Sequence, residues 1–119
     1  MATKAAIYAR VMMDTPGNED NRTGVQVMKC KEYCRQNAWG TSEEFIFMEP
    51  TPSIGHDGAR PVFDKMMALA TQKDPPFKAI VVLEMARFMR DRDMREMARD
   101  KLLANGVKLA AIKDGAKVF

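Results

Sequence analysis

Short apolar runs alternate with helical patterns along the whole of this 119-residue chain, and this alternation is the feature that most constrains its fold. Four runs of strand-forming residues cover residues 4–14, 44–49, 78–85 and 107–112. Three amphipathic stretches lie between them and begin near residues 23, 61 and 93. Strands that alternate with helices are typical of parallel sheets joined by right-handed crossovers. The sequence therefore predicts an α/β fold with three layers (α/β/α) and a mostly parallel sheet of four to five strands.

The first run, KAAIYARVMMD, predicts a buried strand whose far end carries unusual side chains. Because side chains alternate across a strand, Tyr8, Arg10 and Met12 share one face. In open α/β sheets, ligands bind at the carboxyl ends of the strands. A Tyr and an Arg directed the same way at that end indicate a binding or catalytic site. The run at 78–85, KAIVVLEM, is the most continuous and predicts a central strand covered on both faces.

Capping signals set the expected helix boundaries. Thr23 is predicted to N-cap the first helix, with Gln26 completing a capping box, and Gly40 to end it. Pro61 suits the first turn of the second helix. Asp93 is predicted to cap the last helix, which an Asn-Gly pair at 105–106 closes through a left-handed residue. That helix carries one stripe, composed of Met94, Met97, Ala98, Lys101 and Leu102.

The composition is that of an ordinary globular protein, with 46% hydrophobic and 29% charged residues. The length predicts one domain over residues 1–119. No apolar run is long enough to span a bilayer, and no signal peptide is recognised at the N-terminus, so we expect a cytoplasmic protein without membrane association. Two cysteines and one histidine favour neither a zinc site nor a disulfide scaffold. The eleven methionines suit an adaptable core and leave open a pliable binding surface.

Charged side chains follow three of the predicted strands. Tyr8 and Arg10 end the first strand and Glu49 ends the second. Four arginines are predicted to reach this edge, namely Arg10, Arg60, Arg87 and Arg90. Arg87 and Arg90 share a face if their segment is helical. Four guanidinium groups around one cleft suit a phosphodiester, because each planar fork pairs two phosphate oxygens. Spacing alone equally allows scattered surface arginines in salt bridges with nearby acidic residues. The net charge of +3 permits a polyanionic partner.

Five motifs, in order along the chain, resemble the catalytic domain of the serine recombinases, the resolvase and invertase family. YARVMMD resembles the YARVSTD motif that opens that domain. Gln26 falls where the family carries a glutamine in its first helix, and CKEYCRQNAWG is similar to the end of that helix. Glu49 falls at an active-site aspartate, and SIGHDGARPVF resembles the Ser-Gly loop before an Arg-Pro pair. VVLEMARFMRD is similar to the signature around Leu-Asp-Arg-Leu-Ser-Arg.

The resemblance implies a specific chemistry. The family's serine attacks a DNA phosphate, which leaves a 5′-phosphoserine bond and a free 3′-hydroxyl, while arginines stabilise the charge that develops on phosphorus. By the same resemblance the phosphate-binding residues are Arg10, Arg60, Arg87 and Arg90. Tyr8 and Glu49 position them, and Gln26 belongs to the same site. The resemblance implies no cofactor and no metal.

Several positions depart from the family pattern. The nucleophile's position is Met12, whose thioether carries no proton and does not displace alkoxide from phosphorus in water. The aspartate and serine of the third motif are replaced by Ala86 and Met89, and Glu49 replaces a shorter carboxylate. Thr15 lies beyond Met12 and is a poor substitute nucleophile. No dimerisation helix or DNA-recognition domain is recognised within the 119 residues.

These observations predict a degenerate, resolvase-like catalytic domain of a site-specific DNA recombinase that is unable to cleave DNA. Its natural setting is DNA recombination or integration by mobile elements or phages. The expected partner is the DNA phosphate backbone, bound weakly by the isolated chain. Two alternatives stay open at this stage. One is a regulatory partner that pairs with an active recombinase protomer, and the other is a flavodoxin-like module that binds a nucleotide or another phosphate.

Overall fold

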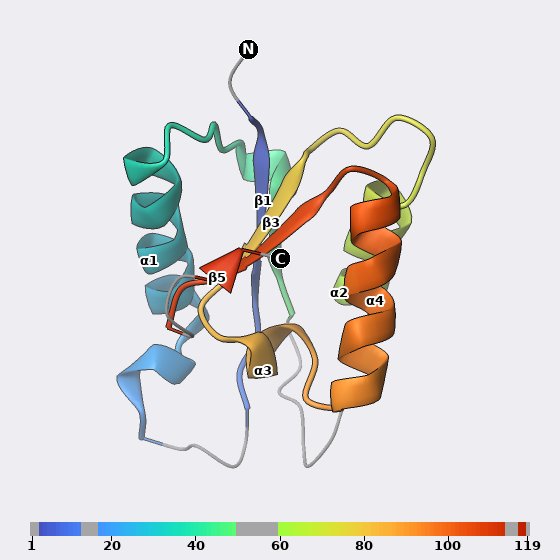
Figure 1. Cartoon of the computed structure of the whole chain (residues 1–119). Coiled ribbons are helices and arrows are strands. Elements are labelled where there is room, and N and C mark those ends of the chain that lie inside the picture. The colour runs from blue at the N-terminus through green and yellow to red at the C-terminus, as the bar shows by residue number, and fades with distance from the viewer. Residues whose placement is uncertain (1–2, 13–16, 50–59, 114–116, 119) are drawn as a thin grey trace.

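The computed structural model describes residues 3–12, 17–49, 60–113 and 117–118 of the chain. Its sheet has five strands in the order β2-β1-β3-β4-β5 (Figure 1). Their bounds are Ala5–Ala9 for β1, Ile46–Met48 for β2, Ala79–Val82 for β3, Lys108–Ala111 for β4 and Lys117–Val118 for β5. β1 to β4 run parallel, whereas β5 pairs antiparallel with β4. The predicted α/β fold with a mostly parallel sheet is confirmed.

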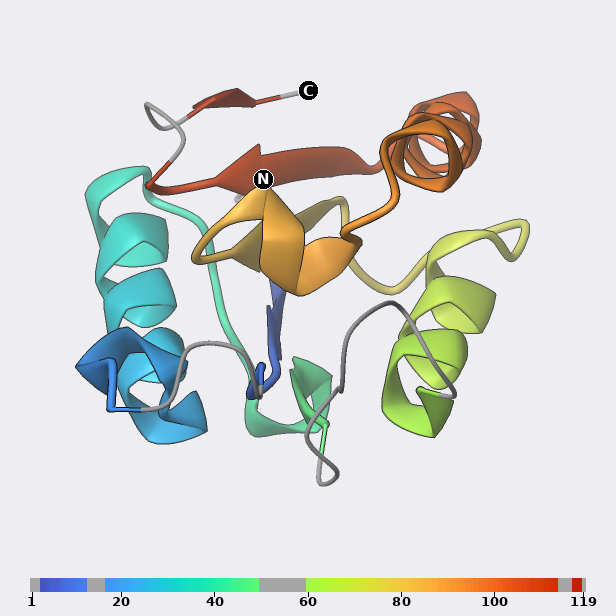
Figure 2. The same cartoon turned by 90° about the horizontal axis from the view of Figure 1, so that it is seen from below.

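Helices cover both faces of this sheet. Their bounds are Thr23–Gln36 for α1, Pro61–Ala70 for α2, Met85–Phe88 for α3 and Arg92–Ala104 for α4. Figure 2 shows α1 on one side of the sheet and α2 and α4 on the other, which gives the three layers. Two short 3-10 helices, η1 (Glu19–Asn21) and η2 (Glu43–Phe45), complete the described elements. Among the helices of the described residues, none has the length and apolar character needed to cross a membrane.

The two faces of the sheet bury different kinds of side chains. The face toward α2 and α4 is rich in aromatic residues, and Tyr8 packs there with Phe63 and Phe88. The face toward α1 is made of smaller residues, among them Cys30 and Cys34. Burial raises the pKa of the Cys30 thiol to about 12 and that of the Cys34 thiol to about 11, because a thiolate is poorly solvated inside the protein. Tyr8 packs on one face of the sheet and its sequence neighbours in β1 pack on the other, so the alternation predicted for the first strand is present.

The ends of β1 and α1 differ from the predictions. β1 stops at Ala9 rather than continuing to residue 14, because the backbone of Arg10 bonds to the side-chain amide of Gln26 instead of to a neighbouring strand. The predicted capping box is wrong, because the Gln26 side chain bonds to the backbone of Arg10. The N-cap residue of α1 is Arg22, not Thr23, and it makes no side-chain cap bond. α1 ends at Gln36 rather than at Gly40, and Ala38, with φ of 56°, takes a left-handed conformation just after the helix.

The last helix also differs in detail. The carboxylate of Asp91, not that of Asp93, accepts the backbone N–H of Met94 and caps α4. The predicted C-terminal turn is present, with Gly106 at φ of 76°. Within the predicted stripe Ala98 and Leu102 are buried, but Met94 and Met97 are 52% and 63% exposed. The stripe is wider than the surface that the sheet covers, so its methionine edge faces outward.

Candidate active site

The predicted site residues gather where β1 and β3 end. β1 is an interior strand between β2 and β3, and Tyr8 and Arg10 lie at its carboxyl end, as the sequence predicts. α3 follows β3 directly and lies across this end of the sheet (Figure 1). Arg87 in α3 donates to the backbone oxygen of Arg10 at 3.2 Å, so the first and third motifs are in contact. Two groups of polar residues occupy this edge.

The first group, which we call the Glu49 cluster, consists of Tyr8, Glu49, Arg60 and Phe63. The Tyr8 hydroxyl donates to Glu49 Oε1 at 2.8 Å. The same carboxylate accepts the backbone N–H groups of Phe63 at 2.9 Å and Val62 at 3.1 Å. Those groups belong to the first turn of α2, whose N-cap residue provides no side-chain cap. Glu49 therefore caps α2 from another strand, and its negative charge lies at the positive end of that helix.

Arg60 closes the other side of the Glu49 cluster. Its Nη1 donates to the backbone oxygen of Phe88 at 2.6 Å and to the Tyr8 hydroxyl at 3.5 Å. Its Cζ lies 3.8 Å from the centre of the Phe63 ring, a cation–π geometry. Burial raises the pKa of Tyr8 far above its ordinary value, and the neighbouring Arg60 charge opposes that shift only partly. The phenol therefore stays protonated and serves as a hydrogen-bond donor, not as a base.

The second group, which we call the Asn21 cluster, consists of Arg10, Met12, Asn21, Gln26 and Arg87. Two side-chain amides form hydrogen bonds with the backbone just after β1. Gln26 accepts the N–H of Arg10 at 3.2 Å and donates to its carbonyl oxygen at 2.9 Å. Asn21 does the same to Met12, at 2.7 Å and 2.9 Å. These amides replace the next strand of a ladder and fix the backbone at position 12.

The two arginines of the Asn21 cluster are fully buried. Arg87 Nη1 donates to Asn21 Oδ1 at 2.5 Å, and its Nε pairs with Glu84 at 3.2 Å. Arg10 Nη2 donates to the backbone oxygen of Ala86 at 2.8 Å. Burying a guanidinium requires hydrogen-bond acceptors, and those described here are backbone and amide oxygens together with the Glu84 carboxylate. The alternative of scattered surface arginines is wrong for Arg10 and Arg87, and also for Arg60, which is likewise buried.

Arginines from three parts of the chain hold α3 in place. The carbonyl of Ala86 accepts from Arg10 and the carbonyl of Phe88 accepts from Arg60, while Arg87 reaches back to β1. Arg90 lies beyond the end of α3 and is half-buried. It does not share a helical face with Arg87, because Met89 between them is extended, with φ of −163° and ψ of 132°. A shared face was predicted only for a helical segment, and α3 ends before Arg90.

The sequence-based prediction missed η1. Asp20 in η1 pairs with Lys29 at 2.6 Å and with Lys113. Hydrogen bonds from these two lysines lower the pKa of Asp20 to about 2. The only local signal is Asn18, whose side chain accepts the N–H of Asp20. Long-range pairing, not local pattern, gives Asn21 its place.

Parts of the predicted site cannot be placed. Thr15 and the loop SIGHDGA at residues 53–59 lie outside the described residues. Within the described ranges, Met12 is buried at the end of the Asn21 cluster and Ala86 supplies only its backbone oxygen to the site. Among those residues no group of three or more His, Cys, Asp and Glu side chains is arranged to hold a metal ion.

Comparison with known proteins identifies the family of this chain. Residues 5–118 match the family described as "Resolvase, N terminal domain". Because the match covers nearly the whole chain, the chain belongs to this family, the catalytic domain of serine recombinases. No curated protein sequence matches the chain.

Solved structures show the same fold at low sequence identity. The N-terminal catalytic domain of TP901-1 integrase has a TM-score of 0.78 and 19% identity, over 97% of this chain and 81% of that one. A resolvase family site-specific recombinase from Streptococcus pneumoniae has a TM-score of 0.73 and 19% identity, over 95% and 74%. The catalytic domain of ISC1926 TnpA, an IS607-like serine recombinase, has a TM-score of 0.73 and 16% identity, over 92% and 70%.

Proposed function

We propose that this chain is a degenerate recombinase catalytic domain, which binds the DNA phosphate backbone weakly and does not cleave it. The observation that carries the proposal is Met12. It follows β1 at the position of the family's nucleophile, and the Asn21 amide fixes its backbone beside Arg10 and Arg87. A thioether has no proton to lose and forms no stable ester with phosphorus.

The bonding of the arginines supports a retained phosphate site. Arg10 and Arg60 donate to the backbone carbonyls of α3, which are neutral acceptors. A phosphate oxygen is a stronger acceptor for a guanidinium than a neutral carbonyl, because the bond is then charge-assisted on both sides. Half-buried Arg90 is the arginine of the predicted set with the most access to a ligand. Few phosphate contacts imply weak binding that falls as salt rises.

The activity test uses a nicked phosphorothiolate half-site duplex carrying a fluorophore. We expect salt-dependent, non-covalent binding and no covalent adduct of the unmodified chain on a denaturing gel. The double variant Met12→Ser with Ala86→Asp restores both family positions, and we expect a trace of covalent protein–DNA species. Met12→Ser alone gives less, because residues that act as a unit are not repaired singly.

The matched control is Met12→Ala with Ala86→Asp, which carries the same carboxylate but no nucleophile and forms no adduct. An adduct formed by the unmodified chain contradicts the proposal and directs attention to Thr15. Absence of any DNA binding at low salt contradicts the proposed role of the arginines.

A second candidate function is that of a regulatory partner for an active recombinase protomer. The exposed Met94 and Met97 of α4 favour an interaction with another protein. The flavodoxin-like alternative has less support, because the chain belongs to the resolvase family.

A further inference from the structure

Lysines stand at the start of three neighbouring strands of the sheet. Lys4 directly precedes β1, Lys78 directly precedes β3, and Lys108 is the first residue of β4. Their backbones are joined in a row, because the N–H of Lys78 donates to the carbonyl of Lys4 at 2.8 Å and the N–H of Lys108 donates to that of Lys78 at 2.9 Å. All three residues are exposed. We call these three residues the lysine edge.

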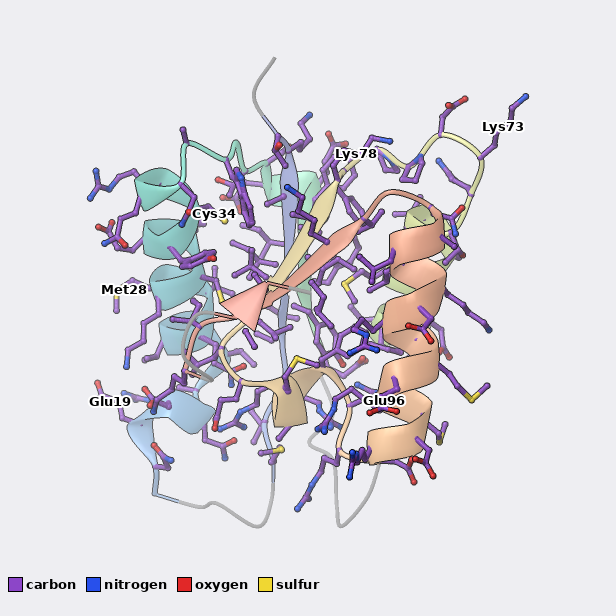
Figure 3. All side chains as sticks on the ribbon, in the orientation of Figure 1. Glu19, Met28, Cys34, Lys73, Lys78 and Glu96 are labelled. Atoms are coloured by element: carbon purple, nitrogen blue, oxygen red, sulfur yellow. The ribbon has the colours of Figure 1, made fainter. Side chains whose placement is uncertain are left out.

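The lysine edge lies at the opposite end of the sheet from the candidate active site. Parallel strands all begin at one edge and end at the other, and the two polar clusters lie where β1 and β3 end. Figure 3 shows Lys78, together with Lys73, at the top of the view, whereas α3 lies at the bottom in the same orientation of Figure 1. The lysine edge is therefore a separate surface, which the Glu49 and Asn21 clusters do not share.

The lysine edge brings like charges together without an internal counter-ion. Lys4 and Lys78 are register neighbours, because Ala5 pairs with Ala79 and adjacent strands lie about 4.8 Å apart. Like charges at adjacent positions of a sheet repel each other. Within the described ranges none of the three lysines forms an ion pair, and the Lys4 ammonium lies 5.4 Å from the centre of the Phe45 ring.

Two common roles of surface lysines do not explain this arrangement. A lysine on an outer strand blocks association between sheets, but β1, β3 and β4 are interior strands. A lysine in the last turn of a helix offsets the helix dipole, but none of the three lies in a helix. The repulsion within the lysine edge therefore has no compensation from these sources.

Acidic residues near this edge do not neutralise it. Glu43 pairs with Lys31 at 3.2 Å, and Glu44 accepts a hydrogen bond from the Ser42 hydroxyl at 3.4 Å. Asp74 is exposed in the segment before β3, where Lys73 adjoins it in the sequence and balances its charge. The three lysines remain as a net positive surface.

We propose that the lysine edge binds the phosphate backbone of a nucleic acid, at a site separate from the arginines. Lys108 is in register with Ala79, so its side chain leaves the sheet on the opposite face from that of Lys78. One compact anion cannot contact ammonium groups on both faces, whereas a backbone that crosses the end of the sheet presents a phosphate to each. A chain that binds DNA at both ends of its sheet holds two segments at once, a consequence that also rests on the proposed function.

Trp39, the single tryptophan, provides a local reporter of this site. It is half-buried and adjoins Gly40, which forms a β-bridge with Lys4. We expect its fluorescence to change saturably on titration with an unlabelled oligonucleotide at low salt, and the binding to weaken as salt rises. A duplex and a single strand of equal length form the two arms of the titration, and a saturable change with either form supports the proposal.

Lys4→Gln and Lys78→Gln each remove one phosphate contact. Each change should reduce the steepness of log K against log salt, measured through Trp39, by roughly 1. The two changes together should weaken binding at low salt by about tenfold or more. The matched control is Lys65→Gln on the exposed side of α2, which loses the same charge and leaves the Trp39 response unchanged. Circular dichroism checks that each variant is folded.

Arg90→Ala separates this proposal from the proposed function. If the arginines do not bind DNA, Arg90→Ala leaves the total binding of a fluorophore-labelled duplex intact, while the lysine changes still remove the Trp39 response. Three results overturn the proposal. One is a Trp39 signal that neither form changes at low salt. Another is a Lys65→Gln variant that binds as weakly as Lys78→Gln, since net charge alone then explains the effect. The third is a Trp39 response that Arg90→Ala reduces as much as Lys4→Gln does.

Discussion

The two polar clusters at the strand ends are built from different kinds of bonds. In the Glu49 cluster, one carboxylate accepts three hydrogen bonds and the buried Arg60 packs against the Phe63 ring. In the Asn21 cluster, side-chain amides bond to backbone groups, and Arg87 donates a hydrogen bond to Asn21 Oδ1. The first cluster joins β1, the end of β2 and α2, whereas the second fixes the chain at the nucleophile's position.

The two clusters therefore differ in role: the Glu49 cluster mainly stabilises the fold, whereas the Asn21 cluster mainly positions the residue at the nucleophile's position. The Glu49 cluster caps the N-terminus of α2, so its residues contribute mainly to the stability of the fold. The Asn21 cluster orients a short segment after β1, and its arginines bond to backbone and amide oxygens and, in the case of Arg87, also to the Glu84 carboxylate. We therefore expect substitutions in the Glu49 cluster to cost more stability than those in the Asn21 cluster.

The largest expected effect is that of Glu49→Ala. It removes the acceptor of the Tyr8 hydroxyl and of two backbone N–H groups of α2. Each buried donor left without its acceptor costs about 1–3 kcal/mol, so the free energy of unfolding should fall by about 3 kcal/mol or more. Urea denaturation measures it. Glu43→Ala is the control, since the exposed Glu43–Lys31 pair contributes about 0.5 kcal/mol or less. A loss below about 1 kcal/mol for Glu49→Ala contradicts its role as the cap of α2.

Asn21→Ala should have an intermediate effect. The change removes one acceptor from Met12 N–H and from Arg87, and we expect the free energy of unfolding to fall by about 2 kcal/mol. Amide hydrogen exchange should accelerate at Met12 more than in β1. Asn37→Ala is the control, because the exposed Asn37 side chain bonds only to the carbonyl of Tyr33 at the end of α1. Equal losses for Asn21→Ala and Glu49→Ala remove the distinction between the clusters.

The smallest effect concerns Asp20, which ties η1 to Lys29 and Lys113. Its pKa falls from an ordinary 3.8 to about 2 in the folded chain, so its contribution is present above pH 4 and is lost as the pH falls toward 2. The lysines are partly exposed, and solvent screening limits this contribution to about 1 kcal/mol. Asp20→Asn should therefore differ from the unmodified chain at pH 7 and match it at pH 2 in urea denaturation. Asp74→Asn, in an exposed turn, should match the unmodified chain at both pH values, and a constant difference for Asp20→Asn rules out titration as its cause.

The sequence predicts the sheet well because burial and period are local properties. The interior position of β1 and the meeting of Arg10 with Arg87 both follow from parallel strands that end at one edge. Gln26 was assigned a local cap because the pattern fits one, but bonds to Arg10 prevailed. Asn21 bonds to Arg87 across 66 positions, and no local pattern reports such a contact.

The methionines of α4 show a different limit. Apolar residues repeat with the same helical period whether they are buried in the core or exposed on the surface. The sequence therefore assigns Met94 and Met97 to one stripe of α4 but does not predict that they are exposed. Asp91 and Asp93 present a similar ambiguity, since either suits the start of α4. The choice depends on where the chain leaves Arg90, which only the tertiary structure decides.

Burial of the paired thiols on α1 has a practical consequence. A thiol reacts with maleimides and oxidants through its thiolate, and the raised pKa values of Cys30 and Cys34 leave very little thiolate at neutral pH. Both side chains are also shielded from solvent by the sheet. A new surface cysteine would therefore be the dominant reactive thiol of the chain, so fluorescent probes could be placed on the protein without first removing its natural cysteines.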